Sequence, residues 1–159
     1  MLEDDTILLT PEGYARLEKE LERLRTTDRR EVADRMREAQ NAGEFAENAE
    51  YEEAKTEQAM LETRIRELRR TLQRAEILTP EMVPTDRVAT GSVVTLKEAG
   101  TGDIWKVTIV GSIEADPDSD LVSDESPLGQ AIIGRTVGDR VTVTVPAGKL
   151  RYKITHISR

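Results

Sequence analysis

The feature that most constrains this chain is a long N-terminal stretch that is almost free of helix-breaking residues. From Thr10 to Glu76 there is no proline after Pro11, and the only glycines are Gly13 and Gly43. The stretch is rich in Glu, Arg, Ala and Leu, which have high helix propensity. Thr10 as an N-cap and Pro11 at the first helical position provide a start signal. Long α-helices are therefore predicted here.

Apolar residues in this stretch recur at the spacing of a coiled-coil seam. The second helix, expected at about 48–76, has an unbroken pattern of Ala54, Gln58, Leu61, Ile65, Leu68, Leu72 and Ala75. The first helix has a pattern that shifts after Asp28, with Tyr14, Leu17, Leu21 and Leu24 before it and Val32, Met36 and Ala39 after it. Residues 41–47 are too few for anything but an antiparallel return. A helical hairpin is therefore predicted.

The composition changes near Thr79. Eight of the ten glycines follow it, together with short Val, Thr and Ile runs. These patterns predict strands at 93–96, 104–110, 141–145 and 152–157, and one short helix at 128–133 after Ser126 as N-cap. We expect two domains, residues 1–78 and 79–159. The predicted fold class is α+β: an antiparallel α-helical coiled-coil hairpin followed by an antiparallel β-sheet domain with one short helix.

The charge and the N-terminus restrict the class of partner. The chain has 23 basic and 31 acidic residues, a net charge of −8. A general nucleic-acid coat or an anionic membrane surface is disfavoured, because both need an excess of Lys and Arg on the binding face, although a local basic patch is compatible with this balance. The absence of Cys excludes disulfides and thiolate metal sites. With acids at the N-terminus and no long apolar run, we expect a cytoplasmic protein without a membrane partner.

The predicted loop of the hairpin is rich in carboxylates. From Gly43 to Glu57 there are six glutamates and one basic residue, Lys55. Oxygen ligands favour Mg²⁺, which takes one or two carboxylates and leaves its other positions to water and phosphate. Glu47 is also explained by the positive end of a helix dipole, whereas Glu44 follows a helix end that disfavours negative charge. A solvated acidic surface and a metal site both fit this pattern.

Three runs of sequence carry a more specific signal. They are Leu9-Thr10-Pro11-Glu12-Gly13-Tyr14, the loop Gly43-Glu44-Phe45-Ala46-Glu47-Asn48-Ala49-Glu50-Tyr51, and Ser126-Pro127-Leu128-Gly129-Gln130-Ala131-Ile132-Ile133-Gly134 followed by Val137-Gly138-Asp139. In this order, and over nearly the whole chain, they resemble bacterial transcript-cleavage factors of the Gre family. The resemblance implies a hairpin that enters the secondary channel of RNA polymerase. It also implies a sheet domain, similar in fold to FKBP-type prolyl isomerases, that docks on the channel rim.

The resemblance further implies a chemistry for the loop. Its acids would hold Mg²⁺ shared with the polymerase and orient the water that cuts backtracked RNA near the nascent 3′ end. The protein would then be a monomeric accessory factor that stimulates the cleavage activity of bacterial RNA polymerase, and not an enzyme by itself.

The family's loop pattern, Gly-Asp-Leu-Ser-Glu-Asn-Ala-Glu-Tyr, assigns roles residue by residue. Glu44 and Glu47 take the places of its two acids and are the predicted catalytic and metal-binding residues. Phe45, Asn48 and Tyr51 are predicted to support the tip, although Phe45 also fits a hydrophobic staple. The Asp-to-Glu change at position 44 moves the carboxylate by about 1 Å, an amount that matters where geometry determines rate.

Basic residues of the hairpin are predicted to contact RNA or polymerase. Lys55 matches a basic position of the family, whereas Gln40 stands where the family often has Arg. Arg23, Arg30 and Arg37 recur every seven residues and are predicted to share one helix face. The other interpretation of these three arginines is a solvated face paired with nearby glutamates.

In the second domain, Asp116, Ser126 and Pro127 align with the family's segment beside the channel rim and are the predicted docking residues. Pro127 is equally explained as the first residue of a helix. Trp105 and Tyr152 are the only aromatic residues after Thr79. On this ground, the resemblance to prolyl isomerases is not expected to extend to their activity, which needs an apolar, aromatic-lined pocket.

Two other functions remain open. A protein of the same fold could occupy the channel without promoting cleavage, as a regulator or inhibitor of the polymerase. A coiled-coil holdase or scaffold would have no polymerase partner, and the loop acids would then have no chemical role.

Overall fold

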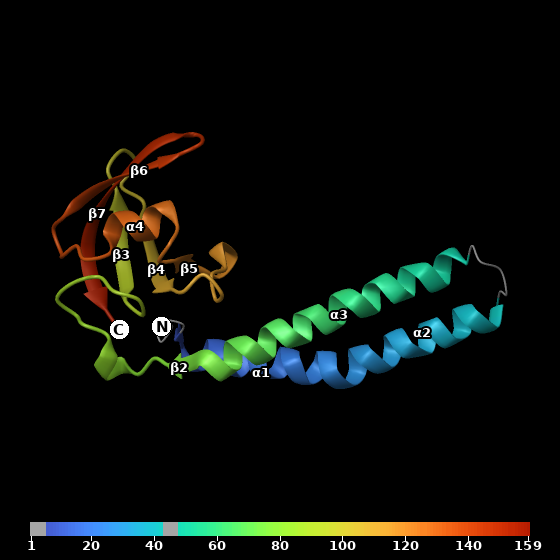
Figure 1. Cartoon of the computed structure of the whole chain (residues 1–159). Coiled ribbons are helices and arrows are strands. Elements are labelled where there is room, and N and C mark those ends of the chain that lie inside the picture. The colour runs from blue at the N-terminus through green and yellow to red at the C-terminus, as the bar shows by residue number, and fades with distance from the viewer. Residues whose placement is uncertain (1–5, 43–47) are drawn as a thin grey trace. The chain divides into compact units, whose positions relative to one another are not determined.

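The computed structural model describes residues 6–42 and 48–159 (Figure 1). The chain divides into a helical unit, made chiefly of Tyr14–Ala75, and a sheet unit made of Ile7–Gly13 and Glu76–Arg159. The sequence placed the boundary at residue 78 and the whole N-terminus in the hairpin, whereas contacts in the structure group Ile7–Gly13 with the sheet unit. No helix among the described residues is long and apolar enough to span a membrane.

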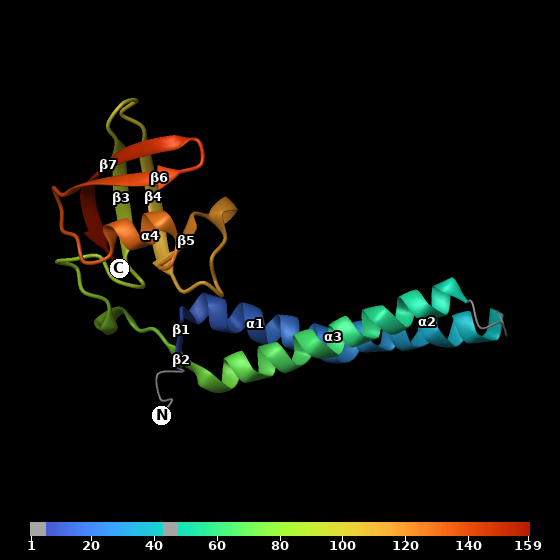
Figure 2. The ribbon, with the colours of Figure 1, turned by 45° about the horizontal axis from the view of Figure 1, so that its top comes forward.

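The helical unit is an antiparallel pair of long helices (Figures 1 and 2). One side is formed by α1 (Pro11–Arg23), a π-helical segment (Leu24–Asp28) and α2 (Arg29–Ala42), and the other side by α3 (Ala49–Arg74). A buried cluster of Val32, Leu61 and Ile65, with Leu21, Leu24 and Met36 against it, joins the two sides. The predicted hairpin is therefore present.

The π-helical segment explains the shift in the apolar pattern. A π turn holds one more residue than an α turn, and that extra residue rotates all later positions by about 100°. Leu24 and Val32 are eight residues apart, yet both face α3 in the same cluster. Asp28 stands where the apolar pattern would place its next apolar residue. Its side chain is only 27% exposed, and its Oδ1 lies 3.5 Å from Nε of Arg23.

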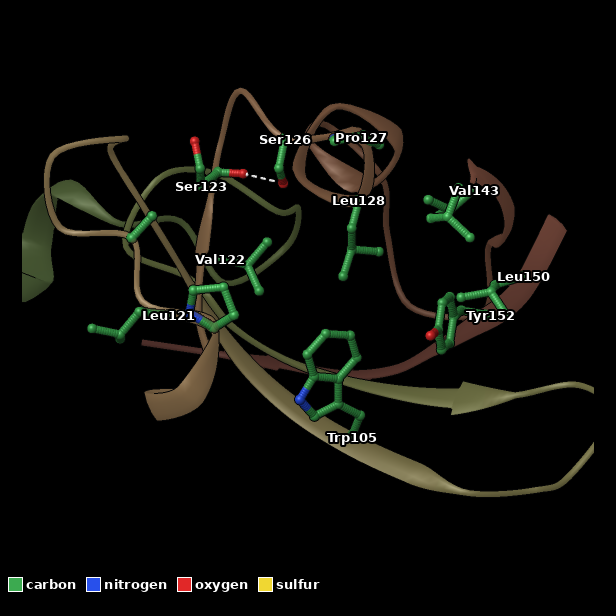
Figure 3. A pocket seen from close by; sticks show the side chains of 13 residues that line it. Trp105, Leu121, Val122, Ser123, Ser126, Pro127, Leu128, Val143, Leu150 and Tyr152 are labelled. Atoms are coloured by element: carbon green, nitrogen blue, oxygen red, sulfur yellow. Dashed lines mark hydrogen bonds between the residues drawn. The ribbon is translucent and has the colours of Figure 1, made fainter. Parts of the chain in front are cut away.

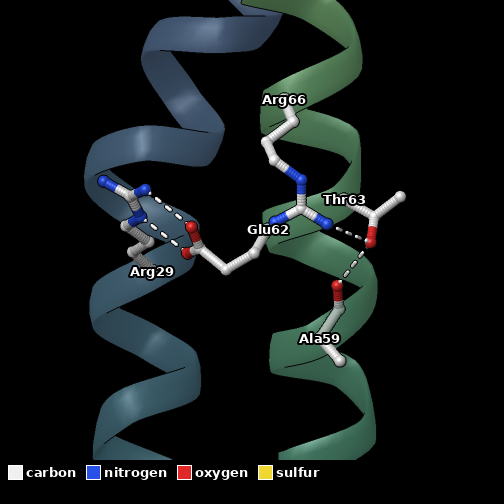
Figure 4. Close-up of polar contacts among 5 residues, drawn as sticks. All are labelled: Arg29, Ala59, Glu62, Thr63 and Arg66. Carbon is white, nitrogen blue, oxygen red and sulfur yellow. Dashed lines mark hydrogen bonds and ion pairs between the residues drawn. The ribbon is translucent and has the colours of Figure 1, made fainter.

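Bidentate ion pairs connect the two sides of the hairpin. Arg29 donates two hydrogen bonds of 2.8 Å to Glu62 (Figure 4). Arg35 contacts Glu57 with two bonds of 2.6 and 2.7 Å in the same manner. These hydrogen bonds lower the pKa of the Glu57 and Glu62 carboxyls. The fork geometry of each pair fixes the register of the helices in addition to their separation.

The sheet unit contains a five-stranded sheet in the order β5-β4-β3-β7-β6. Its strands are β3 (Val93–Glu98), β4 (Ile104–Val110), β5 (Leu121–Ser123), β6 (Arg140–Val145) and β7 (Gly148–Ser158). Three neighbouring pairs are antiparallel, as predicted, whereas β4 and β5 are parallel. The short strand β5 was not predicted, and neither was the separate two-stranded sheet of β1 (Ile7–Leu9) and β2 (Ala75–Ile77).

One face of the five-stranded sheet is covered by α4 (Pro127–Ile132), which contacts β5 and β6 (Figure 2). Ser126 caps this helix by accepting a hydrogen bond of 3.1 Å from the amide of Gly129. The core between helix and sheet includes Leu96, Ile109, Ile132 and Ile154. The opposite face of the sheet carries the exposed residues of the strands.

The start of α1 belongs to the sheet unit and is held by a buried carboxylate. Glu114 is only 3% exposed. Its two oxygens accept hydrogen bonds from the Thr10 amide at 2.7 Å and the Thr10 hydroxyl at 2.6 Å. The Thr10 hydroxyl in turn accepts from the amide of Gly13 at 3.0 Å. Thr10 is thus the predicted N-cap, and Glu114 is a partner that the sequence did not reveal.

Gly13→Ala is expected to destabilise the sheet unit by about 2–3 kcal/mol. An added Cβ would lie 2.1 Å from Oε1 of Glu114, and it would displace a carboxylate whose hydrogen bonds contribute about 1.5–3 kcal/mol each. Urea unfolding followed by the fluorescence of Trp105, the only Trp, measures this change. Gly100→Ala is the matched control, because no atom lies within 4 Å of an added Cβ there. Equal midpoints for the two variants would contradict the close packing at Gly13.

Candidate functional site

The predicted catalytic residues Glu44 and Glu47, and the neighbouring Phe45, lie outside the described residues. The described structure does define both ends of the segment that carries them. The helix α2 ends at Ala42, and the helix α3 begins at Ala49 behind Asn48. Five residues, 43–47, connect these two anchored ends.

Asn48 fixes the start of α3 in two ways. Its side-chain oxygen accepts a hydrogen bond of 3.1 Å from the amide of Tyr51, which is the geometry of an N-cap. Its side-chain amide donates a hydrogen bond of 2.6 Å to the carbonyl of Ala39 in α2. One side chain therefore caps the second helix and connects it to the last turns of the first. This supports the predicted role of Asn48 at the tip and gives that role a geometry.

Asn48→Ala is expected to destabilise the hairpin by about 1 kcal/mol through loss of the cap, and to accelerate amide exchange at Tyr51. Asn48→Asp separates the two contacts, because Asp keeps the acceptor for Tyr51 but loses the donor to Ala39. We expect the Tyr51 amide to exchange as slowly in Asn48→Asp as in the unmodified protein. Amides in the last turn of α2 should exchange faster in Asn48→Asp than in the unmodified protein. Hydrogen exchange measured by NMR resolves the two helices. Full protection of both in Asn48→Asp would contradict the link.

The other predicted tip residues lie in the first turns of α3. Tyr51 is half-buried and Lys55 is exposed. Beside them, a hollow of about 450 Å³ is lined by Arg35, Glu38, Glu50 and Glu53 with three alanines. Among the described residues, no group of three or more potential metal ligands is close enough to hold an ion. The described side of the tip is therefore acidic, and it supplies no metal site without the segment 43–47.

The three arginines predicted to share one face have different environments. Arg23 lies beside Asp28, Arg37 pairs with Asp34, and Arg30 is exposed. The π-helical segment lies between Arg23 and Arg30, and its extra residue rotates Arg30 by about 100° from the side it would otherwise share with Arg23. Arg23 therefore does not share a helix face with Arg30, although the two are seven residues apart. Arg30 and Arg37 both lie in α2, after the π-helical segment, and do share one face.

An apolar pocket of about 330 Å³ lies in the sheet unit between the sheet and α4 (Figure 3). Trp105 lies on one side of it, and Leu128 points toward it from α4. The Trp105 and Tyr152 rings have centroids 6.3 Å apart. The residues lining the pocket are Trp105, Ala115, Pro117, Leu121, Val122, Ser123, Ser126, Pro127, Leu128, Val143, Val145, Leu150 and Tyr152.

Two aromatic residues contribute to the lining of this pocket. Trp105 is on β4 and Tyr152 on β7, the two strands on either side of β3, and both side chains line the same space. The indole of Trp105 is held by a hydrogen bond of 2.8 Å from its Nε1 to Asp120. Burial, and secondarily the charge of Glu98, raises the pKa of Tyr152. The pocket can thus accept an apolar group from a partner.

The predicted docking residues lie at the rim of this pocket. Ser126 and Pro127 line it directly, and Asp116 lies between the lining residues Ala115 and Pro117. Asp116 also organises its own loop, because its carboxylate accepts hydrogen bonds from the Asp118 amide and the Ser119 hydroxyl. Pro127 is both the first residue of α4 and part of the rim. The structure therefore brings the three docking residues to one surface.

Comparison with known proteins assigns the family. Residues 7–77 match the family model described as "Transcription elongation factor, N-terminal", and residues 83–159 match "Transcription elongation factor, GreA/GreB, C-term". The chain belongs to the GreA/GreB family of transcription elongation factors. The resemblance seen in the sequence and the predicted fold class are therefore confirmed.

Full-length relatives agree with this family assignment. The chain is 44% identical to "Transcription elongation factor GreA" of Syntrophomonas wolfei, and 44% identical to that of Alkaliphilus oremlandii, with all of each chain covered in both cases. Among solved structures, GreA factor homolog 1 of Thermus thermophilus is 33% identical, with 97% of this chain and 99% of that chain covered and a TM-score of 0.45.

Proposed function

We propose that the protein binds RNA polymerase, inserts the tip of its hairpin through the secondary channel, and stimulates Mg²⁺-dependent cleavage of backtracked RNA. The observation that carries this proposal is the match to GreA elongation factors over the entire length of the chain. Both units that such a factor needs are present, and the loop keeps an acid at each of the two positions of the family's pattern. The protein is an accessory factor in this proposal, and the polymerase supplies the active site.

The loop's donor set fits Mg²⁺. Glu44 and Glu47 would hold the ion together with the polymerase, and two carboxylates are the protein contribution that Mg²⁺ commonly takes. Bound there, the ion would supply charge stabilisation and activation of water. The chain's own task is positioning. The Asn48 side chain, hydrogen-bonded to Ala39 and Tyr51, fixes the residue that follows the segment 43–47, to which both glutamates belong.

Docking is assigned to the apolar pocket of the sheet unit. An apolar side chain of the polymerase would enter between Trp105 and Leu128, with Asp116, Ser126 and Pro127 around it. Burial of one such side chain contributes about 1.5–3 kcal/mol. Docking and chemistry are then separate, because the pocket binds while the loop acts on the reaction. Mutations in either one should leave the other intact.

The remaining contacts follow from this arrangement. Lys55 and Arg30 are exposed and unpaired among the described residues, so each can reach an RNA phosphate near the nascent 3′ end or the channel wall. Arg23 and Arg37 can do so only by leaving Asp28 and Asp34. We propose that the factor acts as a monomer in the compartment of transcription, which is the cytoplasm in bacteria.

The test is an assay on stalled elongation complexes of a bacterial RNA polymerase. The complexes carry backtracked RNA labelled at its 5′ end, and cleavage is followed with and without the protein. We expect the protein to accelerate shortening of the RNA at least a hundredfold. Binding without acceleration would favour the alternative of a non-cleaving channel regulator. Absence of binding would favour a holdase or scaffold.

A further inference from the structure

Bidentate ion pairs cross the hairpin at several levels, and one of them lies close to the tip. Each joins a guanidinium to a carboxylate through two hydrogen bonds of 2.6 to 3.0 Å. In the described part of the chain these pairs are Glu20–Arg64, Arg29–Glu62 and Arg35–Glu57. Arg35 and Glu57 each lie about two turns, or about 10–12 Å, from the end of their helix nearest the tip. Arg64 lies about 22 Å along α3 from that end.

Apolar packing between the two sides of the hairpin decreases toward the tip. The cluster of large apolar side chains that joins them ends at Met36 in α2 and at Leu61 in α3. Nearer the tip, the buried residues of the described helices are Ala39 and Ala54, and a hollow of about 450 Å³ lies beside them. Methyl side chains interlock little, so they determine the register of two helices weakly. Polar contacts must therefore align the helices at this end.

Arg35 also stands among acids from both helices. It lines the 450 Å³ hollow and a neighbouring hollow of about 210 Å³, and among the described residues it is the one cation in either lining. The acids that line the two hollows are Asp28, Glu31, Glu38, Glu50, Glu53 and Glu57. The hydrogen bonds to Glu57, followed by the charges of Glu57, Glu31 and Glu53, raise the pKa of Arg35. Without Arg35, acids of α2 would face acids of α3 and repel them.

We propose that Arg35 is a positioning residue for stimulated RNA cleavage, because its two bonds to Glu57 align α2 with α3 close to the segment that carries Glu44 and Glu47. This inference rests on the proposed function. Arg35 acts through the helix ends at Ala42 and Asn48, which the segment 43–47 connects. A displacement of about 1 Å at a reacting group can lower a rate by about a hundredfold, even when the altered residue is distant.

The geometry of the Arg35–Glu57 pair, more than its charge, carries this role. The two side chains are 50% and 47% exposed, and an ion pair with that exposure contributes little to stability. Two parallel hydrogen bonds from a guanidinium fix both the distance and the orientation of a carboxylate, whereas an ammonium group binds as a point charge. Arg35→Lys therefore keeps the charge among the acids and loses the orientation.

The first measurement is RNA cleavage in stalled elongation complexes as a function of protein concentration, with the full chain. We expect Arg35→Lys to lower the rate at saturation at least about fivefold. The concentration for half-maximal rate should stay within about twofold, because docking is assigned to the sheet unit. Arg64→Lys is the matched control, since it removes the same kind of contact far from the tip, and it should match the unmodified protein in both quantities. The exchange Arg35→Glu/Glu57→Arg, which rebuilds the pair, should recover most of the rate.

The second measurement needs no polymerase. The chain has no Cys, so nitroxide labels can be attached at Asn41→Cys and Thr56→Cys, two exposed positions on α2 and α3 toward the tip. Pulsed electron paramagnetic resonance then gives the distribution of distances between the labels. We expect Arg35→Lys to broaden this distribution and Arg64→Lys to leave it unchanged.

The outcomes separate this inference from the proposed function. Equal saturated rates for Arg35→Lys and the unmodified protein would overturn the positioning role alone. Equal losses of rate in Arg35→Lys and Arg64→Lys would also overturn it, because the effect would then not depend on distance from the tip. An unchanged distribution of label distances in Arg35→Lys would contradict the alignment of the helices by Arg35. Absence of stimulated cleavage by the unmodified protein would instead contradict the proposed function.

Discussion

Replacing Glu44 and Glu47 together with alanine is expected to reduce stimulated RNA cleavage at least a hundredfold and to leave polymerase binding within about twofold. The two carboxylates are assigned to a step in which charge develops in the transition state, and removal of such a contact lowers the rate without changing ground-state affinity. Loss of one well-placed electrostatic contact commonly costs about 10²–10³ in rate. Cleavage rates at saturating protein, and binding by competition, provide the two measurements.

The matched control for these acids is Glu50→Ala/Glu52→Ala. Both residues are exposed acids in the first turn of α3, so the variant removes the same charge near the tip. We expect it to retain at least a third of the cleavage rate. Equal loss in the two double variants would mean that the tip acts through its general negative charge and not through two placed carboxylates.

Leu150→Asp is expected to weaken polymerase binding at least tenfold while leaving the chemistry of bound complexes unchanged. Leu150 lines the apolar pocket and is only partly buried, so the fold should tolerate the change. A carboxylate there would have to lose water when an apolar group enters, and such a cost exceeds the 1.4 kcal/mol that corresponds to tenfold in affinity. Cleavage at saturating concentrations should recover to the level of the unmodified protein.

Val137→Asp is the control for this change, because Val137 is an apolar residue of the same unit that is 56% exposed and does not line the pocket. A second variant, Ala115→Phe, fills the pocket from its rim and should weaken binding without adding charge. Normal affinity in both Leu150→Asp and Ala115→Phe would move docking away from the pocket. The fluorescence of Trp105 gives an independent signal, since its ring lines the same space.

The helical half of the fold was predictable because its information is local. The heptad of α3 and the cap at Thr10 predicted helices that the structure contains. The π-helical segment was visible only as an irregularity at Asp28, since a wider turn leaves no signature of its own in the residues. The shared face inferred for Arg23 and Arg30 failed for this reason, because helix phase depends on every turn between two positions.

The sheet half was less predictable, since its geometry depends on contacts between distant residues. The short strand β5 pairs with β4 in parallel, and three residues give too little alternation to be recognised. The pocket shared by Trp105 and Tyr152 depends on strand order, which periodicity does not encode. Glu114 is 104 residues from Thr10 in the sequence, and only the fold places its carboxylate against Thr10.

At the candidate site, the resemblance to the family's loop pattern selected Asn48, and the structure adds a geometry for it. A cap residue followed by a first-turn amide is a local pattern, but the bond from Asn48 to Ala39 joins two helices and could not be read from either one. Glu44 and Glu47 rest on the family's loop pattern, and their assignment stays a prediction that experiments on the complex must test.

The most direct measurement of the central claim is the Mg²⁺ dependence of cleavage in stalled complexes. If Glu44 and Glu47 help to hold the ion, the unmodified protein should lower the Mg²⁺ concentration that gives half-maximal rate relative to polymerase alone. The double alanine variant should bind the polymerase but leave this concentration at the value for polymerase alone. An identical Mg²⁺ dependence for the unmodified protein and the double variant, at any rate of cleavage, would contradict the assignment of the two carboxylates to the metal.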